Sequence, residues 1–189
     1  KKLKERAIFE GFTIAGIASI PGSSRIKLRN KALERWLSNN YHAEMKWMEA
    51  ERRKNIGSLL EGAKSVLSVG FNYVSSENDN THKSLKIGKF GQGDDYHKVI
   101  KGRMKQFSSK LIKILKKFNN LKLKVFVDTA PLMEKPLAQE AGVGWQGKHT
   151  NLVSKDFGSW LFLGVILLNQ KIHYDQPQSD LCGNCELCL

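Results

Sequence analysis

The sequence lacks any long apolar segment and any recognisable leader. Its longest apolar run, at 160–168, is far shorter than the ~20 residues that a membrane-spanning helix needs. The first ten residues are rich in charge and contain no apolar stretch of the kind found in a secretory signal. We therefore predict a cytoplasmic protein that does not enter a membrane.

Cysteine is absent from the first 181 positions, and proline is scarce, with four in 189 residues. The 41% apolar content is ordinary for a folded domain, and the length suffices for one sizeable hydrophobic core. Because the chain starts at Lys1 rather than a methionine and stops inside a cysteine pattern, we interpret it as part of a longer protein.

Acidic residues are few. The 18 Asp and Glu are outnumbered by 31 Lys and Arg, which leaves a formal net charge of +13. A field of one sign favours polyanionic partners, since binding releases their condensed counterions. Nucleic acid is the leading candidate, and the alternative is a basic surface that serves solubility.

Helical and strand patterns are interspersed without strict alternation, which predicts an α+β fold with a mixed central sheet flanked by helices. The expected strands are 12–19, 65–73, 122–127 and 160–168, and the last, apolar throughout, is typical of a central strand covered on both faces. Helical spacing is found at 3–9, 28–48 with a break at Asn39 and Asn40, 96–118 and 132–141. We expect a polar loop at 75–83 and a glycine-rich turn at 90–95.

The helix expected at 96–118 has an apolar stripe at steps of three and four residues. The stripe consists of Ile100, Met104, Phe107, Leu111, Leu115 and Phe118. Between Tyr96 and Val127 there are ten Lys or Arg and no Asp or Glu. A solvated helix face usually mixes its signs, so a contact with a polyanion is favoured here over a merely solvated surface.

The three cysteines, Cys182, Cys185 and Cys188, form the pattern C-x-x-C-x-x-C. Three thiolates at this spacing begin the bacterial ferredoxin pattern, in which they bind an iron-sulfur cluster. A zinc site and structural or redox-active thiols are the alternatives, although a cytosolic chain disfavours disulfides. We predict that the three cysteines are iron-sulfur ligands.

Asp128 lies where a strand is expected to end and a helix to begin. It could simply accept backbone N–H bonds at the turn or cap the helix. Alternatively, a carboxyl group that faces an apolar pocket can donate a proton near neutral pH. A reductive cleavage of a C–O bond needs such a donor.

The segment 141–150 has three glycines in six positions, which would let a flat or bulky ligand approach the backbone. Glycines also serve helix caps and tight strand entries, so the signal is weak by itself. The spacing fits neither the dinucleotide fingerprint nor the P-loop. Lys148 and His149 beside Trp145 suit a ligand that contains phosphate, although His149 could equally be a polar residue at a sheet edge.

Five motifs occur in a fixed order: YHAEMKWM, FGQGDDYHKV, VFVDTAPLMEKPLAQEAGVGWQGKHT, GSWLFLG and CGNCELC. In this order they resemble the epoxyqueuosine reductase family over nearly the whole chain. The resemblance implies a cobalamin-binding α+β domain, which we place at 1–175. It also implies a ferredoxin-like domain with two 4Fe-4S clusters, whose beginning we place at 176–189 and whose remainder lies beyond this chain.

The resemblance also implies site residues. Asp128 matches the proposed proton donor, and Cys182, Cys185 and Cys188 match cluster ligands. The segments that match the cobalamin site contain Gly91, Tyr96, His97, Gly147, Lys148, His149, Leu152 and Leu163, and Arg53 is the best match for a further contact. Where the family usually has Glu-Arg after the aspartate motif, this chain has Glu134 and Lys135, which removes the bidentate fork of an arginine.

The resulting hypothesis is reduction of epoxyqueuosine to queuosine in tRNA by a monomer that receives electrons from a flavodoxin or ferredoxin. Two alternatives remain open. One is another cobalamin and iron-sulfur reductase, similar to a dehalogenase and acting on a small molecule. The other is a zinc-dependent RNA-binding module without catalysis.

Overall fold

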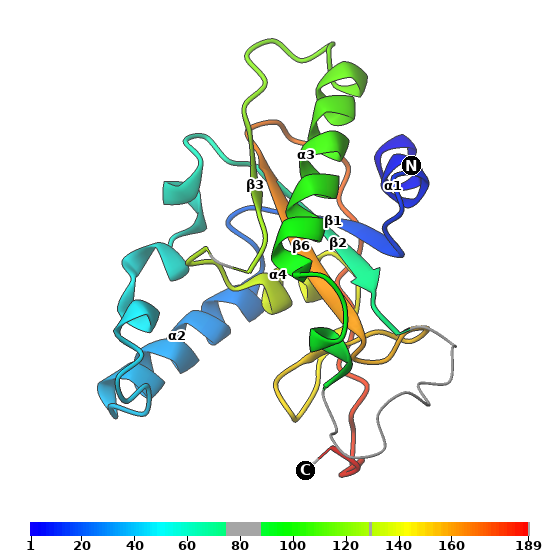
Figure 1. Ribbon diagram of the computed structural model, residues 1–189. Helices are drawn as coiled ribbons and strands as arrows, with labels where there is room; N and C mark the ends of the chain where they lie inside the picture. Colours follow the sequence, from blue (N-terminus) through cyan, green and yellow to red (C-terminus); the bar gives the residue numbers. More distant parts are fainter. Residues whose placement is uncertain (75–87, 129, 189) are drawn as a thin grey trace.

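The fold is an antiparallel sheet between two layers of helices (Figure 1). The computed structural model describes residues 1–74, 88–128 and 130–188, so the polar loop expected at 75–83 lies outside the described residues. The main strands are β1 (Ile14–Ser19), β2 (Ser65–Asn72), β3 (Leu123–Phe126) and β6 (Leu161–Leu168), in the order β1-β2-β6-β3. The α-helices are α1 (Lys2–Phe9), α2 (Ser24–Ser38), α3 (Tyr96–Ile114) and α4 (Glu134–Glu140).

Shorter elements complete the described chain. A two-stranded ribbon pairs β4 (Trp145–Gln146) with β5 (Leu152–Val153), which we did not predict from the sequence. The 3₁₀ helices are η1 (Lys46–Glu49), η2 (Glu51–Arg53), η3 (Ile56–Leu59) and η4 (Lys89–Gly91). The last of these lies in the glycine-rich turn expected at 90–95.

The α+β class is confirmed, but the expectation of a mixed sheet was wrong. Each main strand pairs antiparallel with its neighbours: β1 with β2, β2 with β6, and β6 with β3. The strands β2 and β3 do run parallel and are joined through α3, as in a crossover unit. However, β6 lies between them and runs the opposite way, which the order of elements along the chain could not show.

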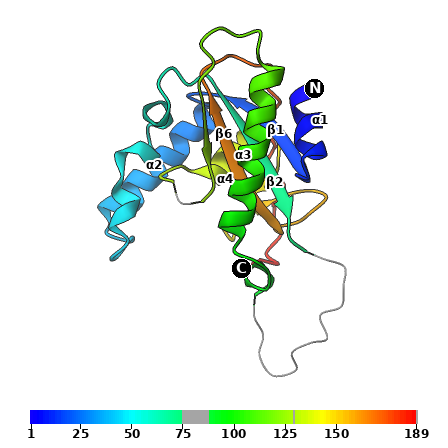
Figure 2. The same ribbon diagram turned by 45° about the horizontal axis from the view of Figure 1, so that its top comes forward.

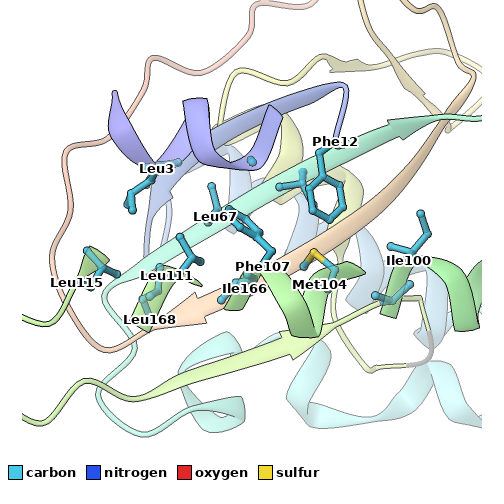
Figure 3. Close-up of a cluster of buried hydrophobic side chains, with 14 residues drawn as sticks. Leu3, Phe12, Leu67, Ile100, Met104, Phe107, Leu111, Leu115, Ile166 and Leu168 are labelled. Atoms are coloured by element: carbon cyan, nitrogen blue, oxygen red, sulfur yellow. The ribbon is translucent and has the colours of Figure 1, made fainter. Parts of the chain in front are cut away.

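Both faces of the sheet are covered, and the side chains of β2 and β6 alternate between the two layers. On one face, Leu67 and Ile166 pack with α1 and α3, as Figure 3 shows. On the other face, Val66 and Leu167 pack against α2, η3 and α4. The expectation that the strand at 160–168 is central is therefore confirmed, because β6 is paired on both edges and buried on both faces.

The apolar stripe of α3 is confirmed as the part of this helix that packs on the sheet. Its residues from Ile100 to Leu115 at helical spacing are at most 4% exposed, and Phe118 is partly buried beside them. The helix ends at Ile114, earlier than expected, because Leu115 leaves helical geometry and is the C-cap residue of α3. In both views α3 crosses the sheet on the side away from α2 (Figures 1 and 2).

The helical pattern expected at 28–48 divides at the predicted break. Helix α2 ends at Ser38, and Asn40 adopts a left-handed conformation that an asparagine tolerates. Beyond it the chain continues as 3₁₀ helices rather than as an α-helix. Only Ile26 of α2 is fully buried, and Leu28 is 65% exposed, so this helix packs less extensively than its pattern indicates.

The strand register determines where Asp128 lies. Phe126 is the partner of Val165 in the pairing of β3 with β6. Asp128 follows two residues after the end of β3, and it lines the same cleft as Leu163 of β6. The sheet thus places two of the predicted site residues, far apart in sequence, at one end of the central strand.

No helix in the described parts of the chain is long and apolar enough to cross a membrane.

Close packing of β1 on α4 makes Gly16 a sharp test of this fold. A Cβ atom at Gly16 would lie 1.8 Å from the backbone oxygen of Ala141, whereas a Cβ at Gly102 of α3 would meet nothing within 4 Å. We expect Gly16→Ala to lower the free energy of unfolding by ~1–3 kcal/mol or more through overpacking. The matched change Gly102→Ala should raise it by ~0.5–1 kcal/mol, because alanine favours a helix interior. Urea denaturation followed by circular dichroism measures the free energy of unfolding of both variants. Equal changes for the two would contradict the close packing of Gly16 against Ala141.

Candidate functional site

A large cleft opens at the end of the sheet where β3 stops and β6 begins. Its volume is about 1190 Å³. One wall comes from α2 and the 3₁₀ helices after it, and the other from the start of β6 and the segment 131–136. The residues that line it and are used below are Trp47, Arg53, Tyr96, Asp128, Glu134, Lys135, Gln146, Phe162 and Leu163. The wall is mainly apolar and aromatic, with a few ionisable groups.

Asp128 is the centre of a hydrogen-bonded cluster at this cleft. The Tyr96 hydroxyl donates to Asp128 Oδ2 at 2.9 Å, and His97 Nε2 lies 3.0 Å from the same oxygen. The Asp128 side chain is 59% exposed and therefore accessible from the cleft. It does not cap α4, whose N-cap residue is Met133 and lacks a side-chain capping bond. The capping alternative from the sequence is thereby excluded.

The position of Tyr96 is set by stacking on the sheet. Its ring lies parallel to that of Phe162 in β6, with centroids 4.1 Å apart and an angle of 2° between the planes. The stack continues from Phe162 to Tyr73, with centroids 4.2 Å apart. Burial and the hydrogen bond to Asp128 raise the pKa of Tyr96 to about 12. The hydroxyl thus stays protonated at neutral pH and remains a hydrogen-bond donor to Asp128.

His97 lies between two carboxylates. Besides Asp128, its Nδ1 lies 2.9 Å from Asp95 Oδ1, while Asp95 also caps α3 by accepting the backbone N–H of His97. Ionised carboxylates only accept hydrogen bonds, so both contacts are satisfied when both ring nitrogens hold protons. The contacts with Asp128 and then Asp95 raise the pKa of His97, and the contact with His97 lowers the pKa of Asp95.

Glu134 is a second carboxyl group in the cleft wall. Its Oε1 accepts the backbone N–H of Asp128 at 2.9 Å, which joins the start of α4 to the end of β3. Burial raises the pKa of Glu134 to about 7, and the negative charge of Asp128 adds to this effect, whereas the Asp128 N–H bond and Lys135 oppose it. Glu134 is consequently a group that exchanges a proton near neutral pH.

Arg53 and Trp47 form a pair on the opposite wall. The Arg53 guanidinium lies over the Trp47 ring, 4.7 Å from its centroid. Partial burial lowers the pKa of Arg53, while the charge of Asp128 acts in the other direction. The structure therefore brings together five predicted site residues around one end of the sheet: Arg53, Tyr96, His97, Asp128 and Leu163.

The remaining predicted site residues do not join this cluster. Gly91 lies in the exposed helix η4, and Leu152 is buried in the core. His149 Nε2 lies 3.0 Å from the Ser159 hydroxyl, which agrees with the alternative of a polar residue in a local contact. The glycines near it have packing reasons: a Cβ at Gly144 would lie 2.3 Å from the backbone oxygen of Val153. Their proposed roles toward a ligand stay predictions.

The cysteine segment packs against β4. Trp145 Nε1 donates to Cys182 Sγ at 3.3 Å, and Lys148 Nζ donates to the backbone oxygen of Cys185 at 2.8 Å. All three cysteines are free thiols, and Cys185 and Cys188 are exposed. Among the described residues, no three His, Cys, Asp or Glu side chains are gathered to hold a metal ion. That the three sulfurs bind one cluster therefore stays a prediction from their spacing.

Sequence reasoning missed the roles of Asp95 and Glu134. The position of Asp95 directly before a helical pattern is a capping signal that was available in the sequence. Glu134 gave no such signal, because its raised pKa depends on burial against the end of β3.

Lys135 replaces the usual arginine of the family. It donates to Asn151 Oδ1 at 2.8 Å and so joins α4 to the turn before β5.

Comparisons with known proteins bear on the same region. The family model described as "Epoxyqueuosine reductase QueG, DUF1730" matches residues 53–129, which run from Arg53 past Asp128. An epoxyqueuosine reductase of Prochlorococcus marinus is 46% identical over 191 residues, with all of this chain covered. The chain spans 59% of the length of that relative.

Solved structures show the same fold. The epoxyqueuosine reductase of Streptococcus thermophilus superposes with a TM-score of 0.81 at 25% identity, over 97% of this chain and 49% of that one. A second epoxyqueuosine reductase, solved with an epoxyqueuosine-modified tRNA-Tyr stem loop, gives a TM-score of 0.81 at 23% identity, over 97% of this chain and 48% of that one. Sequence and fold agree over almost all of this chain, which therefore belongs to the epoxyqueuosine reductase family.

Proposed function

We propose that the protein containing this chain reduces epoxyqueuosine to queuosine in tRNA. The observation that supports this most directly is the Tyr96, His97 and Asp128 cluster at a large cleft, inside the segment matched by the family model. A solved relative of the same fold was crystallised with an epoxyqueuosine-modified tRNA stem loop. We place the protein in the cytoplasm, where its tRNA substrate is found.

The proposed reaction defines what the site must supply. Converting the epoxide to an alkene breaks both C–O bonds, forms a C=C bond and releases the oxygen as water. This consumes two electrons and two protons. The residues of this chain can contribute the protons and their placement.

Protons are available from the Asp128 cluster. His97 is favoured in its doubly protonated form by two carboxylates, and Tyr96 holds its own proton at neutral pH. Asp128 touches both donors and is exposed to the cleft. Asp128 can therefore take up a proton from His97 and pass it to the leaving oxygen, while Tyr96 fixes the orientation of its carboxyl group.

The cleft fits cobalamin in size and chemistry. A volume of about 1190 Å³ is larger than that of most sites for small ligands, and its apolar and aromatic walls suit a broad flat ring. Leu163 and Phe162 would lie against the ring, with Arg53 near polar groups on its edge. The chemistry that cobalamin supplies when bound is low-potential reduction at cobalt.

The cysteine segment fits an iron-sulfur cluster by its donor set. Three free thiols at C-x-x-C-x-x-C spacing supply three ligands, and the Trp145 N–H donates to one of the sulfurs, a contact that tunes such clusters. Gln146, the next residue of β4, lines the cleft. Successive strand residues point to opposite faces, so β4 and the Trp145 indole lie between Cys182 and the cleft. We infer that 4Fe-4S clusters supply single electrons there, received from a flavodoxin or ferredoxin.

The proposed function is tested by analysing the modified nucleosides in tRNA from cells that lack the gene. We expect mass spectrometry to find accumulated epoxyqueuosine in place of queuosine, and restoration by the wild-type gene. The anaerobically purified protein should convert epoxyqueuosine-modified tRNA with a low-potential reductant. An unchanged amount of queuosine in the tRNA of the deletion strain would refute the proposal. Purified protein that contains zinc and no iron would favour the RNA-binding alternative.

Asp128→Asn tests the proton donor. We expect turnover to fall by ~10²–10⁴-fold, as is typical when a general acid is lost, while the corrin absorption spectrum of bound cobalamin stays unchanged. Asp156→Asn is the matched control, because Asp156 is exposed and lies in the turn after β5, away from the cluster. Equal turnover of Asp128→Asn and the parent would remove Asp128 from the mechanism.

Glu134 should titrate near neutrality. Nuclear magnetic resonance of the labelled carboxyl carbons should give Glu134 a pKa near the value of about 7, and Glu134→Gln should remove that signal. A carboxyl whose pKa is higher in the folded than in the unfolded state stabilises the fold at low pH. This contribution, about 3 kcal/mol, should be present below about pH 4.5 and lost as the pH rises through about 7. A Glu134→Gln variant whose stability changes with pH as steeply as the parent's would contradict the assignment.

A further inference from the structure

Helix α3 presents a row of lysines on the side away from the sheet. Lys98, Lys101, Lys105, Lys110 and Lys113 lie on the helix, Lys116 follows its end, and all six are exposed. At 100° per residue the five helical lysines spread over the outer half of α3, with Lys101 and Lys110 on its two flanks, on the side away from the buried stripe of Ile100, Met104, Phe107 and Leu111. The packing of α3 on the sheet therefore forces these charges outward, where Figure 2 shows the helix on the surface of the fold.

These lysines are not neutralised locally. None of the six forms an ion pair with another residue in the described ranges, and the same holds for Lys2, Lys27 and Lys31 on α1 and α2, so the distinguishing feature of α3 is the density of charge of one sign. The helix itself contains no Asp or Glu between its cap, Asp95, and its end. Uncompensated like charges on one helix face cost stability, so their retention without partners indicates a ligand that supplies the negative charge.

We propose that the outer face of α3, from Lys98 to Lys116, binds the phosphate backbone of the RNA substrate outside the catalytic cleft. This inference rests on the proposed function for the identity of the RNA. It adds a second contact surface, separate from the residues that touch the modified nucleotide.

The geometry suits a nucleic acid strand. The 19 residues of α3 span about 28 Å at 1.5 Å per residue. One strand of a duplex carries a phosphate about every 3.4 Å along the duplex axis, so a helix of this length extends over about eight phosphates of axial rise. The helix begins at Tyr96, which touches Asp128 in the cleft, so a backbone that leaves the cleft can continue along the lysine row.

An acidic protein, such as an electron donor, is the competing partner for a basic surface. Lysine is depleted at protein–protein interfaces, which favour aromatic residues and arginine around an apolar centre. The outer α3 face exposes five lysines and no aromatic residue within its bounds, and the one exposed large apolar side chain on it, Ile112 at 51% exposure, lies between Lys101 and Lys105 around the helix without forming an apolar centre. Flexible ammonium groups in a row match phosphates, which need charge but little directional fit. The chemistry therefore favours RNA.

The test compares two triple variants of the full-length protein. Lys101→Gln, Lys105→Gln and Lys113→Gln remove three charges from α3. The control, Lys2→Gln, Lys27→Gln and Lys31→Gln, removes three exposed charges from α1 and from the side of α2 turned away from the cleft. Both should keep the parent's circular dichroism spectrum and melt no lower than the parent, because all six side chains are exposed and the α3 changes relieve repulsion between like charges.

Binding to an unmodified tRNA transcript is measured by fluorescence anisotropy at several salt concentrations. We expect the α3 variant to bind at least ~10-fold more weakly, with the slope of log Kd against log salt reduced by about 2–3, and the control to change far less. Equal affinities and slopes for the two triple variants would overturn the proposal. An α3 variant that binds tRNA normally but accepts electrons more slowly from an acidic donor protein would overturn it as well.

The readout separates this inference from the proposed function, because it requires no turnover. A protein that fails to reduce epoxyqueuosine, yet shows the difference between the two variants, would keep the RNA-binding surface and lose the proposed reaction. A protein that reduces epoxyqueuosine with identical tRNA binding by both variants would keep the reaction and lose the surface.

Discussion

The pairing of β6 with β2 on one edge and β3 on the other is the constraint on which the site depends. Because β6 is buried on both faces, its register cannot slip by one residue without moving every apolar side chain to the wrong layer. That register ends β3 two residues before Asp128, so that Asp128 lines one cleft with Leu163, and it presents Phe162 to the ring of Tyr96. The arrangement of the proton-holding cluster is thus a consequence of core packing at the middle of the sheet.

Helix α3 joins two properties that the proposed function needs. Its first turn holds Tyr96 and His97 on Asp128, with Asp95 acting both as helix cap and as the second carboxylate for the imidazole. Its buried stripe anchors it to the sheet, and the same periodicity sends its lysines outward. One amphipathic helix therefore both positions the ionisable cluster and presents a charged surface that starts at the cleft.

The short ribbon of β4 and β5 links the cleft to the cysteine segment. Glycines at 142, 144 and 147 permit the close backbone approaches that this part of the chain requires, and at each a Cβ would meet a neighbouring group at 2.3–2.7 Å. Trp145 contacts Cys182 and Gln146 lines the cleft, so the ribbon lies between the cysteine segment and the cleft. The glycine pattern that suggested ligand contact is thus explained first by packing within the chain.

The sequence alone determined the α+β class, the burial of the 160–168 strand, the stripe of α3 and the break after α2, since these follow from local periodicity and turn chemistry. The family resemblance added Arg53, Tyr96, His97 and Asp128, which the structure brings to one cleft. Only the tertiary structure decided that the sheet is antiparallel, because the insertion of β6 between β2 and β3 is a long-range pairing with no local signature. The role of Glu134 was likewise hidden, since a raised pKa arises from burial against a distant strand end rather than from the residues on either side.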